Sequence, residues 1–176
     1  MKSKPRLFYR IQQFKLALWP PTQVVETEQI RTYLTPPQLT IFRRLQKSEQ
    51  WHAFTVFIKL LETGQKNPDL LTAALLHDIG KIHYPLEIWE RVFIVLVKRA
   101  APHLVSRWGQ DKPQGLSKPF VVACHHAEWG AELATRAGAS KLTTDLIRRH
   151  EKRVDETSSS RTDRILRMLQ QADNSS

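Results

Sequence analysis

From residue 24 onward, the chain consists of short stretches in which apolar residues recur at intervals of three and four, separated by prolines and glycines. These intervals place apolar side chains on one face of an α-helix, whereas the alternation typical of half-buried strands is almost absent from the sequence. Because proline and glycine end helices, each stretch is expected to be one short helix. The expected helices cover residues 25–33, 35–45, 48–63, 68–77, 86–99, 102–108, 127–137, 140–149 and 160–173. The pattern therefore predicts an all-α fold built from short helices packed around one core.

A chain of 176 residues is most simply one domain. A chain of this size can bury roughly 70% of its unfolded surface, so it needs no covalent staples. We expect residues 25–176 to form this domain, with Pro20 and Pro21 marking the boundary before it. The single Cys124 excludes an internal disulfide, which suits a reducing, cytoplasmic location and leaves nitrogen and oxygen as the ligands of any metal.

Residues 1–24 form a basic amphipathic segment, in which lysines and arginines are interspersed among apolar residues. No continuous apolar stretch follows these charges, so the segment is predicted to be neither a signal peptide nor a membrane-spanning helix. We expect it to dock on its own domain, and a weak contact with an anionic membrane surface is the alternative. The formal net charge of +10 favours anionic partners: a phosphorylated small molecule, nucleic acid or a membrane.

The stretch from residue 73 to residue 81, with the sequence AALLHDIGK, ends an apolar helical run with two adjacent metal-type ligands, His77 and Asp78. Neutral imidazole and carboxylate both bind divalent first-row metals. Gly80 is expected to stop the helix, and Lys81 follows it directly. A lone His-Asp pair is also a common polar helix end, so the interpretation depends on further ligands elsewhere in the chain.

Two further residues supply the same kinds of ligand on faces that should be buried. His52 borders the apolar stripe of the helix expected at residues 48–63. Asp173 follows Leu166 and Leu169 at helical spacing, which places its carboxylate on the buried face of the last helix. A buried carboxylate needs a partner, and a cation is the natural one.

In this order, the four residues resemble the H…HD…D signature of the HD-domain metal-dependent phosphohydrolases. The resemblance covers roughly residues 35–174. It implies a compact multi-helix bundle with a metal centre between its helices, where the first metal is held by His52, His77, Asp78 and Asp173.

The segment at residues 126–132, HAEWGAE, resembles the H-x-E-x-G-A-E segment of the HD-GYP and related HDIG subgroups, in which a second metal is bound. The resemblance implies that His126 holds this second metal. The adjacent His125 is the alternative, and His126 is preferred because a glycine follows it four residues later.

A second segment at residues 147–151, IRRHE, resembles the I-R-x-H-H segment of the same subgroups. His150 occupies the first histidine position, and Glu151 stands where the second histidine is expected. The resemblance implies that His150 also holds the second metal and that Asp78 bridges the two ions; glutamate can ligate a hard cation as well. The GYP motif is absent after Glu151, which weakens cyclic di-GMP as the expected substrate.

These resemblances imply hydrolysis of a phosphate ester or phosphodiester by metal-activated water, and a nucleotide is the expected substrate. One or two divalent transition-metal ions per chain are expected, with manganese, iron or cobalt as candidates. Such ions lower the pKa of bound water and hold a phosphoryl oxygen. Asp78 and Lys81 are the expected catalytic residues, because the ammonium group of Lys81 could pair with substrate phosphate. The alternative for Lys81 is a favourable position at a helix C-terminus.

Two other classes of function are open at this stage. One is a nucleotide-sensing regulatory module that keeps the ligands without turnover. The other is an HD-type mixed-valent di-iron oxygenase, which uses the same set of imidazoles and carboxylates. A specific nucleic-acid partner is not expected, because the sequence contains no recognisable reading motif or stacking platform.

Overall fold

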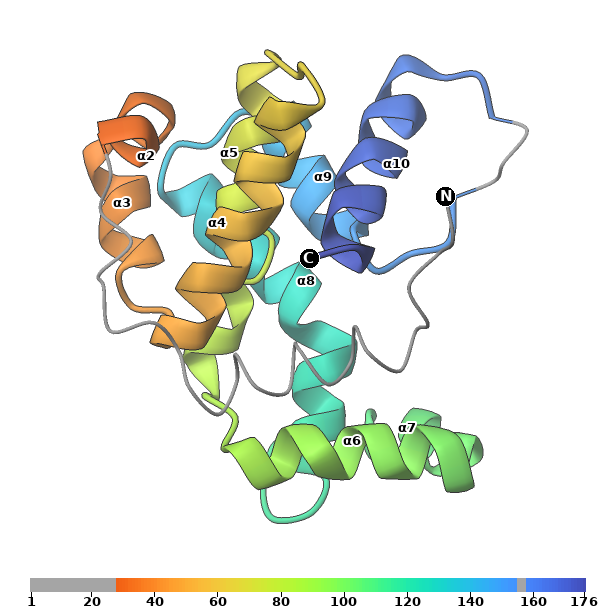
Figure 1. Cartoon of the computed structure of the whole chain (residues 1–176). Coiled ribbons are helices and arrows are strands. Elements are labelled where there is room, and N and C mark those ends of the chain that lie inside the picture. The colour runs from red at the N-terminus through yellow and green to blue at the C-terminus, as the bar shows by residue number, and fades with distance from the viewer. Residues whose placement is uncertain (1–27, 155–157) are drawn as a thin grey trace.

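The computed structural model describes residues 28–154 and 158–176, so the predicted N-terminal segment and the start of the helix expected at 25–33 lie outside it. Within the described residues the chain is helical and contains no strand, which confirms the predicted all-α bundle (Figure 1). The elements are α2 (Glu28–Tyr33), α3 (Pro36–Phe42), α4 (Lys47–Glu62), α5 (Pro68–Leu76), the 3-10 helix η1 (Ile79–His83), α6 (Ile88–Ala100), α7 (Pro102–Trp108), α8 (Lys118–Arg136), α9 (Lys141–Arg149) and α10 (Arg161–Asn174).

The centre of the bundle is α5, whose residues from Leu70 to Leu76 are all buried. A helix that is apolar on every side needs neighbours on every side. These neighbours are α4, α9, α10, α2 and α3, and Figure 1 shows α4 and α10 side by side in front of the core. Because α5 ends inside the bundle, His77 and Asp78, which follow it directly, are buried.

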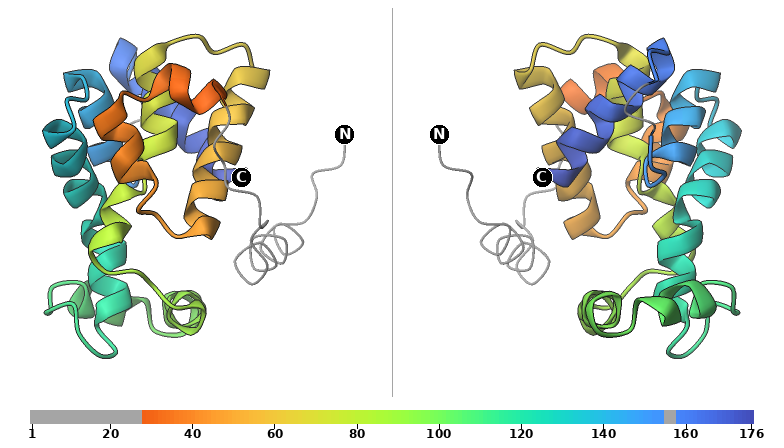
Figure 2. Two further views of the ribbon diagram at one scale, coloured as in Figure 1. Left: turned by 90° about the vertical axis from the view of Figure 1, so that its left-hand side faces the viewer. Right: turned by 90° about the vertical axis from the view of Figure 1, so that its right-hand side faces the viewer.

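The longest described helix, α8, joins two parts of the molecule. Its C-terminal half packs against η1 and α9. Its first turns pack against α6 and α7, which stand apart from the bundle (Figure 2). Phe120, near the start of α8, contacts the ring of Phe93 of α6 edge to face and the tilted ring of Trp108 of α7. None of the helices in the described part of the chain is long and apolar enough to cross a membrane.

The contact between η1 and α8 depends on a glycine. A Cβ atom at Gly80 would lie 1.9 Å from the carbonyl oxygen of His126 and 2.7 Å from the amide nitrogen of Gly130, so no larger residue fits there. The expectation that Gly80 stops the preceding helix was wrong: α5 ends at Leu76, and Gly80 lies within η1. Its missing side chain allows close packing between the two helices.

Most expected helices agree with the structure to within a few residues. The hydroxyl groups of Ser140 and Ser160 accept backbone N–H groups at the starts of α9 and α10, and so cap both helices at their expected first residues. Two boundaries differ. The N-cap of α4 is Gln46, two residues before the expected start at residue 48, because the Glu49 side chain accepts a hydrogen bond from the Gln46 amide. Helix α8 begins nine residues before the expected start, because its first turns are buried against α6 and α7.

Candidate metal centre

The six residues predicted to hold metal come together in two adjacent groups. The first ligand group consists of His52 on α4, His77 directly after α5 and Asp173 on α10. The second ligand group consists of Asp78, His126 and His150, from the start of η1, from α8 and from the end of α9. Within each group, the candidate ligand atoms all lie within 4.8 Å of one another.

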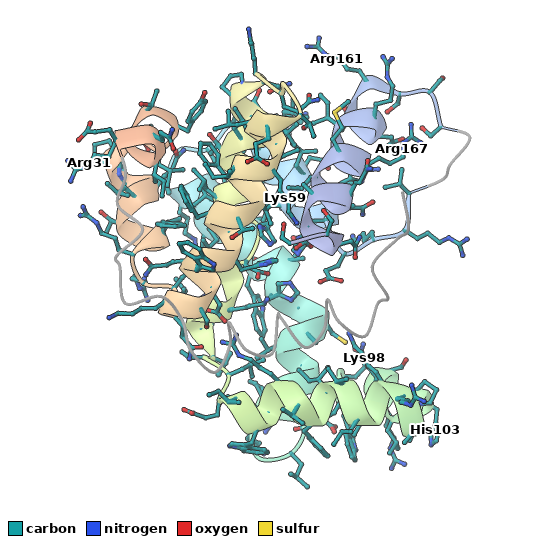
Figure 3. The ribbon with its side chains drawn as sticks, in the orientation of Figure 1. Arg31, Lys59, Lys98, His103, Arg161 and Arg167 are labelled. Carbon is teal, nitrogen blue, oxygen red and sulfur yellow. The ribbon has the colours of Figure 1, made fainter. Side chains whose placement is uncertain are left out.

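The first ligand group is partly open to solvent. The Nε2 atom of His52 lies 2.8 Å from Oδ1 of Asp173, at hydrogen-bond distance, and Nε2 of His77 lies 3.7 Å from the same oxygen. The side chains of His52 and Asp173 are 26% and 24% exposed, whereas that of His77 is 1% exposed. Next to Asp173, the carbonyl oxygen of Ser175 accepts a hydrogen bond from Lys59, which holds the end of α10 against α4 (Figure 3).

The second ligand group is almost completely buried. Oδ1 of Asp78 lies 3.4 Å from Nε2 of His126 and 3.9 Å from Nε2 of His150. The two imidazole Nε2 atoms are 3.2 Å apart. No side chain of this group is more than 5% exposed.

Asp78 lies between the two groups. Its Oδ1 atom faces His126 and His150, and its Oδ2 atom lies 3.6 Å from Nε2 of His77. Oδ2 also accepts a hydrogen bond from Nζ of Lys81 at 2.6 Å. One carboxylate oxygen is thus turned toward each group, which is the geometry that a bridging ligand needs.

The buried histidines share one tautomer. Nδ1 of His77 lies 2.9 Å from the carbonyl oxygen of Ala74, and Nδ1 of His150 lies 2.7 Å from that of Ile147. Carbonyl oxygens only accept, so each Nδ1 donates and each neutral ring keeps a lone pair on Nε2. Both residues follow a helix end, where the last carbonyls have no backbone partner. His126 has the same arrangement within α8, where Nδ1 donates to the carbonyl of Val122.

This arrangement leaves lone pairs facing one another in the interior. Nε2 of His77 is buried without a hydrogen-bond partner in the described part of the chain. The Nε2 atoms of His126 and His150 meet at 3.2 Å with a lone pair on each. Buried acceptors without a donor are destabilising, and a cation between them removes that cost. The ligand atoms, with each Nδ1 held by a backbone carbonyl oxygen, therefore fit a divalent metal.

The charges of the site support the same conclusion. Burial alone would raise the pKa of Asp78, but Lys81 and the surrounding histidines hold it well below the usual range. Burial alone would also raise the pKa of Asp173, whereas His77 and His52 lower it to about 2. Burial lowers the pKa of His126 to about 3 and also lowers that of His150. At neutral pH the centre thus presents ionised carboxylates together with neutral imidazoles at His126 and His150, the forms that bind metals.

A polar cleft of about 420 Å³ adjoins the centre. It is lined by residues 150–154 and by four residues of α10, namely Arg167, Gln170, Asp173 and Asn174. Each ligand group contributes one residue to this lining, so both groups border the cleft. A larger hollow of about 620 Å³ on α6 is apolar and contains none of the ligands. The cleft of 420 Å³ is therefore the candidate substrate site.

The sequence left open the role of Lys81 and the choice between His125 and His126, and the structure shows where each side chain lies. Lys81 contacts the Asp78 carboxylate and is not part of the cleft lining. The ring of His125 lies 3.0 Å from the carbonyl oxygen of Gly109 and stacks on Trp129, outside both ligand groups. The structure thus brings His126 rather than His125 to the site.

The cleft also contains Gln170, which was not among the predicted site residues. Gln170 lies one helical turn before Asp173, and its amide nitrogen donates to the carbonyl oxygens of His150 and Lys152 at 2.8 and 2.7 Å. It therefore ties α10 to the chain that follows α9. Gln170 lies three residues before Asp173 and therefore on the same face of the helix, so the sequence could have indicated its place near the site.

The model of the HD domain family matches residues 39–176, and this range contains every residue of both ligand groups. The chain belongs to the HD-domain family. This family is typical of metal-dependent phosphohydrolases and binds divalent metals, in agreement with the buried histidines and aspartates of this chain. No curated protein and no solved structure gave a significant match.

Proposed function

We propose that this protein is a metal-dependent phosphohydrolase that cleaves a phosphate ester or phosphodiester of a nucleotide. The observation that carries the proposal is the pair of ligand groups joined by Asp78, with imidazole lone pairs that meet in the interior without a donor. Two divalent ions held there would lower the pKa of a bound water and polarise a phosphoryl oxygen. The predicted ligands of both ions are His52, His77, Asp78, His126, His150 and Asp173.

The cleft supports an anionic substrate of nucleotide size. Its volume of about 420 Å³ lies within the range usual for small-molecule sites, roughly 300 to 1,000 Å³. Lys152, Arg153 and Arg167 line it, and Figure 3 shows Arg167 on the side of α10 turned toward the chain after α9. Guanidinium and ammonium groups bind phosphate oxygens through charge-assisted hydrogen bonds. These cations would hold the phosphate groups of the substrate next to the metal ligands.

Two residues would complete the chemistry. The Asp78 carboxylate, with one oxygen toward each group, would fix the relative position of the two ions. The Lys81 ammonium, 2.6 Å from Asp78, adds positive charge beside the first ligand group. Charge developing on phosphate oxygens would be stabilised from this side.

The experiment is a hydrolysis panel combined with elemental analysis. The purified protein would be loaded in turn with manganese, iron, cobalt, magnesium and zinc, and assayed against phosphomonoesters, nucleotides and cyclic dinucleotides. We expect turnover with at least one metal, and its loss in Asp78→Ala but not in Asp111→Ala, which removes an exposed carboxylate of the loop after α7. Nucleotide binding without turnover would instead indicate a sensor, and oxygen consumption by a di-iron form would indicate an oxygenase.

A further inference from the structure

Glu151 approaches the second ligand group from the cleft. It is the second residue after the end of α9 and directly follows His150. Its Oε1 atom lies 3.9 Å from Nε2 of His126 and 3.9 Å from Nε2 of His150. The carboxylate oxygen is thus equally distant from the two facing nitrogens, although its side chain is 60% exposed.

The separations of the two imidazole nitrogens from each other, from Asp78 and from Glu151 are those of ligands around one ion. Ligands bound at about 2.1 Å lie about 3.0 Å apart at right angles, about 3.4 Å apart in a tetrahedron and about 4.2 Å apart when opposite. His126 and His150 are separated by 3.2 Å, and Oδ1 of Asp78 lies 3.4 and 3.9 Å from them. The two distances of 3.9 Å to Glu151 fall in the same range. Of these four residues, only Asp78, His126 and His150 have ligand atoms that all lie within 4.8 Å of one another, so the exposed Glu151 side chain would move toward these three to share one ion.

An ordinary ion pair does not account for the position of Glu151. A pair with His126 or His150 needs a proton on Nε2, but Nδ1 of each ring already donates to a backbone carbonyl. The Glu151 oxygen is therefore one more acceptor beside two acceptors, and a cation satisfies all of them.

We propose that Glu151 is a ligand of the ion in the second ligand group, which makes this site one of two imidazoles and two carboxylates. The inference rests on the proposed metal centre. Two carboxylates neutralise a divalent ion and shift the preference of the site from zinc and nickel toward harder ions such as manganese, because oxygen ligands suit manganese and imidazole suits zinc. Glu151 thus sets both the occupancy and the metal preference of the second site.

The test is metal binding, measured without substrate. Manganese and zinc would be titrated into the metal-free full-length protein by calorimetry, with stoichiometry from elemental analysis and spin coupling between two manganese ions from paramagnetic resonance. Glu151→Ala and Glu151→Gln should weaken manganese binding at the second site by at least about 10-fold, and spin coupling should be lost at metal concentrations that just fill both sites of the wild type. Glu132→Ala, which removes another exposed glutamate, should bind both ions as the wild type does.

A third variant separates coordination from a general effect of charge. Glu151→His should retain two-ion binding while raising zinc affinity relative to manganese, whereas a simple loss of charge would weaken both metals alike. Because Glu151 is exposed, the variants should keep the thermal stability of the metal-free protein. Wild-type manganese affinity and spin coupling in Glu151→Ala, or a wild type that binds only one ion, would overturn the proposal. Hydrolysis without any effect of Glu151 on metal binding would refute this inference alone, and Glu151-dependent metal binding without hydrolysis would refute only the proposed function.

Discussion

The two ligand groups differ in how they are satisfied when no metal is bound. In the first group, His52 and Asp173 are about one quarter exposed and share a hydrogen bond of 2.8 Å. In the second group, His126 and His150 are buried and direct their lone pairs at each other. A proton can satisfy the first pair, whereas burial disfavours a proton between the two imidazoles of the second group, which a metal ion satisfies instead. The comparison indicates that the second group is preorganised for metal and should fill first, and that the first group should exchange its ion more readily.

Asp78→Ala should have the largest effect, because Asp78 belongs to both sides of this comparison. Its removal deletes one ligand of the second group and the carboxylate oxygen that faces His77. We expect turnover to fall by at least about 1,000-fold, on the order seen when a catalytic unit is broken. Metal content should fall from two ions toward none in elemental analysis. Two bound ions and near-normal turnover would show that the groups are independent of Asp78.

One variant from each ligand group tests which group binds metal first. With one equivalent of manganese, His52→Ala should bind the ion as tightly as the wild type, because the second group is intact. His126→Ala should bind it roughly 100-fold more weakly, since it lacks a buried ligand. Calorimetry measures both affinities, and circular dichroism would check that His126→Ala remains folded. Weaker first binding in His52→Ala than in His126→Ala would invert the comparison.

The ligands of the two groups could be named from the sequence for different reasons. Asp173 was found from its helical spacing to Leu166 and Leu169, which are indeed buried. His126 was chosen over His125 because of the glycine at position 130. The structure gives that choice a physical reason, because Gly130 lies against Gly80 and α8 therefore approaches η1 at His126. Local periodicity and short motifs carried this information.

Other features of the site depend on tertiary contacts that local patterns do not encode. The opposition of His126 and His150 results from the packing of α8 against α9. The contact between Lys81 and Asp78 depends on the 3-10 conformation of η1, whereas the glycine at position 80 predicted only the end of a helix. The early start of α8 follows from burial against α6 and α7, so the expected boundary at residue 127 was too late.

Lys81→Met tests whether the charge beside the first group acts on substrate or on metal. Nζ of Lys81 contacts Oδ2 of Asp78, the oxygen that faces His77. We expect kcat/KM to fall about 10- to 100-fold, with two ions still bound, because one charge near the phosphoryl group is lost. Lys66→Met, which removes an exposed lysine of the α4–α5 loop, is the matched control. Loss of the first ion in Lys81→Met would assign Lys81 to metal binding instead.

The buried group should also make the metal-free protein sensitive to acid. Burial lowers the pKa of His126 from 6.5 to about 3, so the unfolded chain binds more protons than the folded one between these values. Stability should therefore fall as the pH decreases through this window, and His150, shifted in the same direction, should add to the loss. The melting temperature should decrease by several degrees between about pH 7.5 and pH 5. His126→Gln should show a smaller decrease, and His103→Gln, at an exposed position on α7, should match the wild type.

The smallest effect should come from the cleft that both groups border. Lys152 and Arg153 are exposed cations of its lining, so each contact with a substrate phosphate is screened by water and salt. Replacing both with serine should raise KM by about 2- to 10-fold and leave kcat unchanged, as expected for two surface charge pairs. The matched control is the double replacement of Lys98 and Arg99, exposed on α6, which changes the net charge equally but lies outside the cleft. If the two double variants raise KM alike, the overall charge of +10 rather than the cleft attracts the substrate. The KM of the wild type should then also rise with salt.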